Sequence, residues 1–222
     1  TNAIKFSDLE ERFPLLYSYL KDHEDRIKSE VQHRAGDLWH TYTREHNHSL
    51  YSIDKIIVPM TAKDTIATFM QNKGLYMDNS NVWFVYVDGA TDLLMKAIAC
   101  VVNSTIFSVL GKSGANPQDG GYYKFNKQFL APIPFPSSKF RNNAPVVNAF
   151  SAMYDDIVEL QRQYTCASRP VKEMLSHTLR VKWNELDELC YGLYEVDEME
   201  RRQIADIGRT IDRIELLNGV KG

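Results

Sequence analysis

The sequence predicts an α/β (α+β) fold, in which a compact mixed-sheet domain is followed by a helical C-terminal segment. Two runs rich in β-branched and aromatic residues, 54–60 (DKIIVPM) and 82–87 (VWFVYV), are typical of strands. Residues 92–110 instead carry apolar side chains at helical spacing. From Asn148 onward the apolar stripes are all helical, so we expect strands only in the first part of the chain.

The other elements before residue 110 follow from their local patterns. Residues 13–27 predict an amphipathic helix, with Pro14 at a position that a first helical turn tolerates. Residues 61–69 predict a short turn of helix between the two strands. The apolar run at 92–110 predicts a buried helix with a break near Asn103.

Residues 111–136 combine a loop, a short strand and a proline-rich end. Glycines and Pro117 are typical of turns, residues 122–125 are typical of a strand, and three later prolines exclude a helix. From Lys112 to Arg141 the chain carries five cations and one acidic residue, a local charge of +4: Lys112, Lys124, Lys127, Lys139 and Arg141 against Asp119. Cations, amides and aromatic rings on one loop suit a polyanion better than a small molecule. The simpler interpretation, a surface loop with lysines that promote solubility, stays open.

Three apolar stripes at helical spacing follow residue 148. They lie within residues 149–160, 171–189 and 197–217, and Asp197 and Glu200 have the spacing of a capping box. This part has 10 lysines and arginines against 14 acidic residues, a net charge of −4, which is typical of a spacer or packing segment. Composition therefore predicts an α/β domain at 1–140, which carries the basic stretch, and a helical spacer or packing segment at 146–222.

Composition also limits the class of protein. The whole chain has a formal net charge of −3, so any nucleic-acid surface has to be local. The three cysteines are far apart and in no metal-binding spacing, which is typical of reduced thiols in the cytoplasm. No run approaches the roughly 18 apolar residues of a membrane span. Because the chain begins at Thr1 with a polar segment, we expect it to be a fragment of a longer protein.

The sequence offers little for catalysis. Five of the six histidines lie in the first quarter, but they lack the regular spacing of a zinc site, and we expect no metal. The segment Gly111-Lys-Ser-Gly114 follows a predicted helix and lacks the earlier glycine of a phosphate-binding loop. Neither a nucleophile elbow nor a cysteine with a neighbouring histidine is present. These observations favour a binding module over an enzyme.

Five motifs in a fixed order carry a family resemblance. They are FPLLYSYL at 13–20, WxxYxR at 39–44, KIIVP at 55–59, VNS at 102–104 after an apolar helix, and GYYKF at 121–125 leading to PIP at 132–134. This set resembles the TaqI-like C-terminal specificity domain of type IIG-like restriction-modification enzymes. The ending around 186–194 is similar to the helical ending of those proteins.

The resemblance implies a bacterial target-recognition domain that reads a short sequence in duplex DNA. It implies an N-terminal adenine-specific DNA methyltransferase domain in the same protein, with or without a fused endonuclease. S-adenosylmethionine, and magnesium for a nuclease, would bind in those other domains, so we expect no cofactor and no catalysis in this fragment. The resemblance suggests that Tyr42, Arg44 and residues 122–124 lie close to DNA.

Residue chemistry extends this set. Amides pair with adenine and Arg or Lys with guanine, and lysines also neutralise phosphates. The expected DNA-contacting residues are Tyr42, Arg44, Lys63, Lys112, Asn116, Gln118, Tyr122, Tyr123, Lys124, Asn126, Lys127 and Lys139. Among these, Lys63, Lys112 and Lys139 are assigned to phosphates. Two alternatives stay open: a protein-interaction domain that docks a partner subunit through its acidic helices, and a hydrolase whose site the patterns do not reveal.

Overall fold

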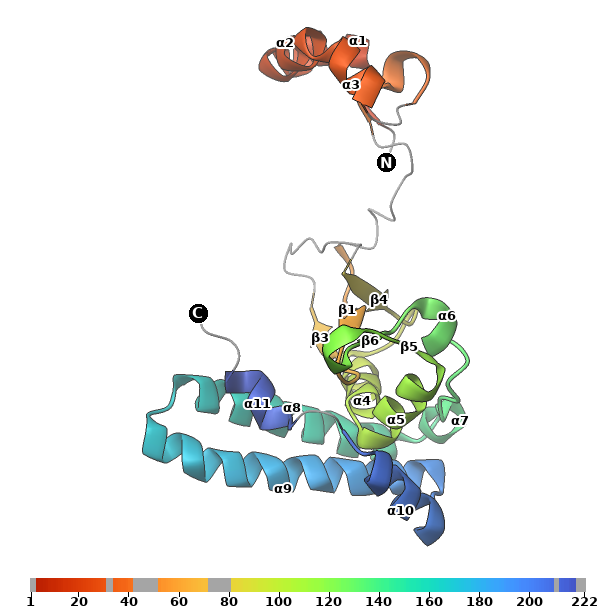
Figure 1. Cartoon of the computed structure of the whole chain (residues 1–222), viewed down its shortest axis with the longest axis vertical. Helices are drawn as coiled ribbons and strands as arrows, with labels where there is room; N and C mark the ends of the chain where they lie inside the picture. Colours follow the sequence, from red (N-terminus) through yellow and green to blue (C-terminus); the bar gives the residue numbers. More distant parts are fainter. Residues whose placement is uncertain (1–2, 31–33, 42–51, 72–80, 210–211, 219–222) are drawn as a thin grey trace. The chain divides into compact units, whose positions relative to one another are not determined.

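A computed structural model describes residues 3–30, 34–41, 52–71, 81–209 and 212–218. The chain forms two compact units, Thr1–Ile53 and Asp54–Gly222. The first is helical, and the second contains two small sheets and long helices (Figure 1). The predicted α+β class is therefore confirmed.

The first unit contains three short helices, α1 (Phe6–Arg12), α2 (Pro14–Asp22) and α3 (Glu24–Glu30), and the 3-10 turn η1 (Gly36–Leu38). Its buried centre includes Leu9 and Trp39, and the Phe6 ring lies 4.9 Å from the Trp39 ring. The sequence predicted a single helix over residues 13–27. The structure has two helices there, because α2 ends at Asp22 and α3 begins at Glu24. The Leu15 side chain is 87% exposed, so the apolar stripe of α2 does not build a core.

The first sheet of the second unit, sheet A, has the strand order β3-β1-β4 and is antiparallel. The strands are β1 (Lys55–Pro59), β3 (Thr68–Met70) and β4 (Val82–Val85). The two predicted strands are confirmed. The helical turn predicted at 61–69 is wrong, because this segment forms two short strands, one in each sheet, around a bend. Thr68 pairs with Ile57 across sheet A, and this pairing overrides the local helical spacing.

The second sheet, sheet B, has the order β2-β6-β5 and is also antiparallel. Its strands have only two residues each: β2 (Thr61–Ala62), β5 (Asn116–Pro117) and β6 (Tyr123–Lys124). The described strands thus form two antiparallel sheets instead of the one mixed sheet that the sequence predicted.

The predicted buried helix is confirmed together with its break. It consists of α4 (Asp92–Val102) and α5 (Thr105–Gly114), and Ser104 begins α5 by accepting a hydrogen bond from the Phe107 backbone N–H. Helix α5 is longer than expected, because Gly111 and Lys112 are helical and not part of a loop. None of the described helices is by itself long and apolar enough to cross a membrane; α4 and α5 meet that test only as a pair bent by 64°.

Two short helices, α6 (Lys127–Leu130) and α7 (Ser137–Phe140), flank the proline-rich segment. They lead into α8 (Ala144–Cys166) and α9 (Arg169–Tyr194), which lie side by side and antiparallel in Figure 1. Helix α10 (Glu198–Ile207) begins with the predicted capping box of Asp197 and Glu200. The stripe predicted at 197–217 then divides, and α11 (Arg213–Asn218) forms a separate helix.

One hydrophobic core joins sheet A to the long helices. Ile56 and Val58 of β1, Val101 of α4, and Leu179 and Leu186 of α9 belong to the same buried cluster. Helix α4 packs on both sheet A and α8. The composition change near residue 140 is therefore no boundary between compact units, which instead divide after Ile53.

Candidate nucleic-acid interface

Sheet B is built on a glycine turn between β5 and β6. Gly120 and Gly121 have φ angles of 72° and 77°, a left-handed conformation that glycine adopts without strain. The turn returns the chain so that the Gln118 backbone N–H donates to the Tyr122 carbonyl oxygen at 2.7 Å. The Gly-Gly pair that sequence analysis assigned to a turn therefore sets the register of the sheet.

The register aligns polar side chains in a row across the sheet. Lys124 of β6 lies opposite Thr61 of β2 on one side and opposite Asn116 of β5 on the other. Directly opposed residues of antiparallel strands project from the same face of a sheet. Thr61, Asn116 and Lys124 are all exposed, so this row faces solvent.

Alternation along the strands extends that row. Residues two apart in an extended segment share a face, which adds Gln118 and Tyr122. Lys63 lies in the bend after β2 and joins this face through its contact with Tyr122. The Lys63 ammonium lies 5.4 Å from the centre of the Tyr122 ring, which agrees with this assignment. We call these six residues the outer face of sheet B: Thr61, Lys63, Asn116, Gln118, Tyr122 and Lys124.

The opposite side of sheet B is apolar and tightly packed. Phe125 is fully buried against Ala62 and Ala115, and its carbonyl oxygen accepts a hydrogen bond from the Trp83 indole at 2.8 Å. Gly111 of α5 is close to this ring, since a Cβ added there would lie 3.3 Å from Phe125 and 3.1 Å from the Thr65 methyl group. The short strands thus rest on a support that fixes the outer face.

Two of the lysines assigned to phosphates have carboxylate partners. The Lys112 side chain is 7% exposed and its ammonium lies 2.5 Å from the carboxylate of Asp64, which is fully buried. Lys139 is exposed and pairs with Glu195, which holds the pKa of Glu195 below its usual value. Neither residue lies on the outer face of sheet B. Their predicted phosphate contacts stay predictions, and the interface described here does not include them.

The remaining expected contacts fall in three places. Tyr123 is half-buried on the inner side, where its ring lies 6.1 Å from Phe125 and 5.8 Å from the Lys112 ammonium. Asn126 is half-buried and precedes α6, whose first residue, Lys127, is exposed. Tyr42 and Arg44 lie outside the described residues.

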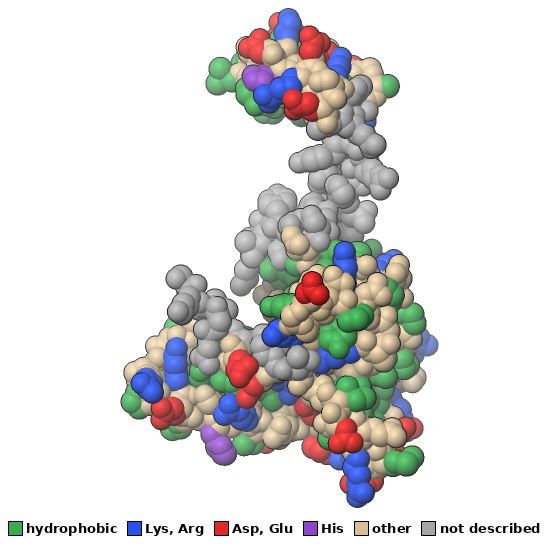
Figure 2. All heavy atoms as spheres, viewed as in Figure 1, with side chains coloured by type: hydrophobic (Ala, Val, Ile, Leu, Met, Phe, Trp, Pro, Cys, Tyr) green, Lys and Arg blue, Asp and Glu red, His purple; other side chains and the backbone are tan. Residues whose placement is uncertain are grey.

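The net charge of the exposed residues around the outer face of sheet B is positive, but it is smaller than the +4 counted in the sequence. Lys63, Lys124 and Lys127 face one exposed acidic residue, Asp119, which leaves +2 where the stretch alone indicated +4. Over the long helices the signs are interspersed, as Figure 2 shows for one side of the molecule. Positive charge and exposed amides therefore coincide at sheet B.

Sequence analysis missed two contributors. Thr61 joins the row only because β2 pairs with β6, a contact across more than 60 positions that local pattern does not reveal. Asp64 neutralises Lys112, and its place beside Lys63 in a polar segment gave no sign of full burial.

Other chemistry is sparse in the part of the chain that is described. It contains no group of three His, Cys, Asp or Glu side chains that would hold a metal ion. Cys100 and Cys190 are buried, which raises the pKa of both thiols, that of Cys190 to about 12, while Cys166 is exposed. Comparison with known proteins leaves the family open, since no family model matches the chain and no curated protein is similar to it in sequence.

Proposed function

We propose that the chain is a sequence-specific recognition module for double-stranded DNA and that the outer face of sheet B contacts the bases. One observation carries the proposal: strand register brings two amides, a tyrosine and Lys124 to a single supported face, and Lys63 joins them beside Tyr122. A β-ribbon of this kind fits the major groove of B-DNA, which is about 12 Å wide.

The residue types support base reading as well as attraction to phosphates. Asn116 and Gln118 carry the side chains that pair bidentately with adenine, and Lys124 suits the O6 and N7 acceptors of guanine. A good pair contributes about 1 to 3 kcal/mol of discrimination between bases. Lys63 and Lys127 suit neighbouring phosphates, which position the protein without reading sequence.

The same proposal accounts for the small total charge. A protein that coats DNA without specificity needs a broad basic surface, whereas this chain has a net charge of −3 and a local +2. Tight binding would then need the further contacts of a larger enzyme. We therefore propose, in line with the resemblance to TaqI-like specificity domains, that the module acts beside a DNA adenine methyltransferase domain of the same protein.

A selection from a library of random duplexes tests this function. The 222-residue chain is expected to enrich a short common sequence, and Asn116→Ala with Gln118→Ala is expected to abolish or relax that sequence preference. Both side chains are exposed, so the double variant should keep its fold. Asn148→Ala, an exposed asparagine of α8, is the matched control and should enrich the wild-type sequence.

A groove on the helical side favours a second candidate function, docking of a partner protein. Met153 of α8 and Val181 and Leu189 of α9 line it together with acidic Glu185 and Glu188. Val181 and Leu189 are 42% and 38% exposed, so an apolar strip faces solvent, and the two glutamates at its edge pair with Lys182 and Arg201. The library selection separates the two functions, because a module that only docks a protein enriches no DNA sequence.

A further inference from the structure

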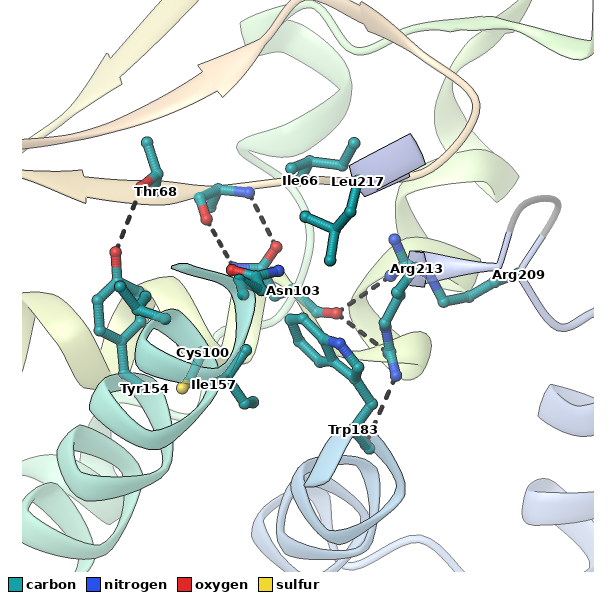
Figure 3. A pocket seen from close by; sticks show the side chains of 13 residues that line it. Ile66, Thr68, Cys100, Asn103, Tyr154, Ile157, Trp183, Arg209, Arg213 and Leu217 are labelled. Carbon is teal, nitrogen blue, oxygen red and sulfur yellow. Dashed lines mark hydrogen bonds between the residues drawn. The ribbon is translucent and has the colours of Figure 1, made fainter. Parts of the chain in front are cut away.

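A cavity of about 220 Å³ lies in the second unit, and its described lining residues include none of the outer face of sheet B. It is lined by the ends of α4 and β3, by α8 and α9, and by α11 (Figure 3). Ile66, Ile157 and Leu217 give it apolar walls, while Trp183, Arg209 and Arg213 gather on one side in the figure. Among the described lining residues, the two arginines are the only charged ones.

Arg213 is held rigidly at this cavity. Its guanidinium forms a two-pronged ion pair with Asp187, with both distances 3.0 Å, and lies 4.6 Å from the centre of the Trp183 ring. It also donates to the Asn103 carbonyl oxygen at the break between α4 and α5. The Arg213 charge is therefore balanced by one carboxylate.

Arg209 has no comparable partner. Its two terminal nitrogens donate to the backbone carbonyl oxygens of Asn103 and Thr65, at 3.1 and 3.2 Å. Its ion pair with Asp64 is long, 4.0 Å, and Asp64 already pairs with Lys112 at 2.5 Å. Among the described residues, these ion pairs join three cations, Arg209, Arg213 and Lys112, to two carboxylates, Asp64 and Asp187, so these groups leave one positive charge in excess.

Buried N–H groups at the cavity also lack acceptors. Trp183 Nε1 and Arg213 Nε are buried and have no hydrogen-bond partner. Arg209 Nε also makes no hydrogen bond, although it faces the Asp64 carboxylate at 4.0 Å. The Trp183 and Arg213 residues are only 8% and 9% exposed. Native proteins rarely leave buried donors without a partner, so each such group needs an explanation.

We propose that this cavity binds a small organic monoanion, whose carboxylate lies at Arg209, Arg213 and Trp183 and whose apolar part packs on Ile66, Ile157 and Leu217. A carboxylate supplies the missing negative charge and accepts hydrogen bonds from donors in a plane, as arginine favours. The volume is below the roughly 300 to 1,000 Å³ of sites for drug-sized ligands, so the ligand is small.

The state of Arg209 agrees with this assignment. Burial, and then the neighbouring Arg213 charge, lowers the pKa of Arg209 to about 10. The charged form of Arg209 is thus disfavoured by its surroundings, and a bound anion would favour it.

Calorimetric titration of the 222-residue chain with benzoate and with benzamide tests the site. Benzoate is expected to bind saturably at millimolar concentrations, and benzamide, its neutral counterpart, at least about tenfold more weakly because it lacks the charge-assisted hydrogen bonds. Arg209→Gln is expected to weaken benzoate binding about tenfold on the same grounds. Arg169→Gln, whose side chain is 92% exposed on α9, is the matched control and should bind as the wild type.

Absence of saturable benzoate binding, or equal affinity for benzoate and benzamide, would overturn the assignment. Circular dichroism checks that the Arg209→Gln variant is folded. If that variant is unfolded, benzoate binding by a second variant, Val158→Phe, tests the site instead. Val158 lines the cavity and is 42% exposed, so a larger ring there fills the space from the surface and leaves both arginines in place. Val158→Phe is expected to abolish benzoate binding, and unchanged binding by this variant would place the benzoate elsewhere.

Discussion

Lys112 and Lys124 lie twelve positions apart in the same polar stretch, yet they have opposite surroundings. Lys124 is exposed in the middle of sheet B, between Thr61 and Asn116. Lys112 is covered by helix packing and pairs with the fully buried Asp64. One lysine is available to a ligand, whereas the other holds the fold together.

The difference shows that local charge in a sequence is not the same as surface charge. Asp64 lies 48 positions before Lys112, and the β2 bend brings it under α5. The basic stretch therefore divides into a structural cation and a smaller group of exposed ones. Mutations at the two lysines should accordingly change different properties.

The largest expected effect is on stability. Lys112→Ala leaves the Asp64 carboxylate buried without its ammonium partner, so we expect the free energy of unfolding to fall by about 3 to 5 kcal/mol. Lys124→Ala is the control and should change it by less than about 0.5 kcal/mol. Urea unfolding of both variants measures this, and equal losses would remove the distinction between the two lysines.

The next effect is on base discrimination. Under the proposed function, Asn116→Ala should reduce the preference for the selected duplex over a single-base variant by about 1 to 3 kcal/mol at one position. Competition binding with duplexes that differ at each position measures it. A uniform loss across all duplexes would instead assign Asn116 to the DNA backbone.

A smaller effect is expected where α11 is held to α9. Burial tends to raise the pKa of Asp212, but the Ile214 backbone N–H and Arg180 outweigh it and lower the pKa below the ordinary 3.8. The contribution of Asp212 is thus present above pH 3.8 and lost as the pH falls through its folded pKa. Because Asp212 and Arg180 are partly exposed, Asp212→Asn should cost less than about 1 kcal/mol at neutral pH.

Urea unfolding at neutral pH and at a pH below the folded value measures that difference. The wild type and Asp212→Asn should converge at the acidic pH, where Asp212 is protonated in both the folded and unfolded states. A difference that persists in acid would show that the ion pair with Arg180 is not its source.

The smallest effect is expected at Lys139, which is exposed but paired with Glu195. Lys139→Ala should leave the salt dependence of DNA binding unchanged, because the residue is away from the outer face of sheet B. It should also leave unfolding by urea nearly unchanged, since exposed ion pairs contribute little. A reduced salt slope would extend the interface to α7.

The sequence predicted those parts of the fold that depend on local pattern. The helix break at Asn103, the capping box of Asp197, and the strands at 54–60 and 82–87 all follow from residues close together in the chain. The helix predicted at 61–69 was wrong because pairing with distant strands decides the conformation of that segment.

The sequence predicted the types of side chain in the candidate site, but not which residues lie together there. Asn116, Gln118, Tyr122 and Lys124 stood out in the sequence by their amide, aromatic or basic side chains, and strand pairing with alternation puts them on one face. Thr61 belongs to the site because β2 pairs with the distant strand β6. Lys112 does not belong to it, because its side chain forms an ion pair with the distant residue Asp64. Neither contact has a local signal, so a single sequence does not reveal it.

The salt dependence of duplex binding tests the central claim most directly. If Lys63 and Lys127 each neutralise a phosphate while Lys124 contacts a base, the logarithm of the binding constant should fall with the logarithm of the salt concentration with a slope of about −1.8. The triple alanine variant of these lysines should bring that slope close to zero. Alanine at three exposed arginines of α8, α9 and α10 should leave it unchanged: Arg162, Arg169 and Arg202. A slope that survives loss of the three lysines would contradict the assignment of DNA contacts to sheet B.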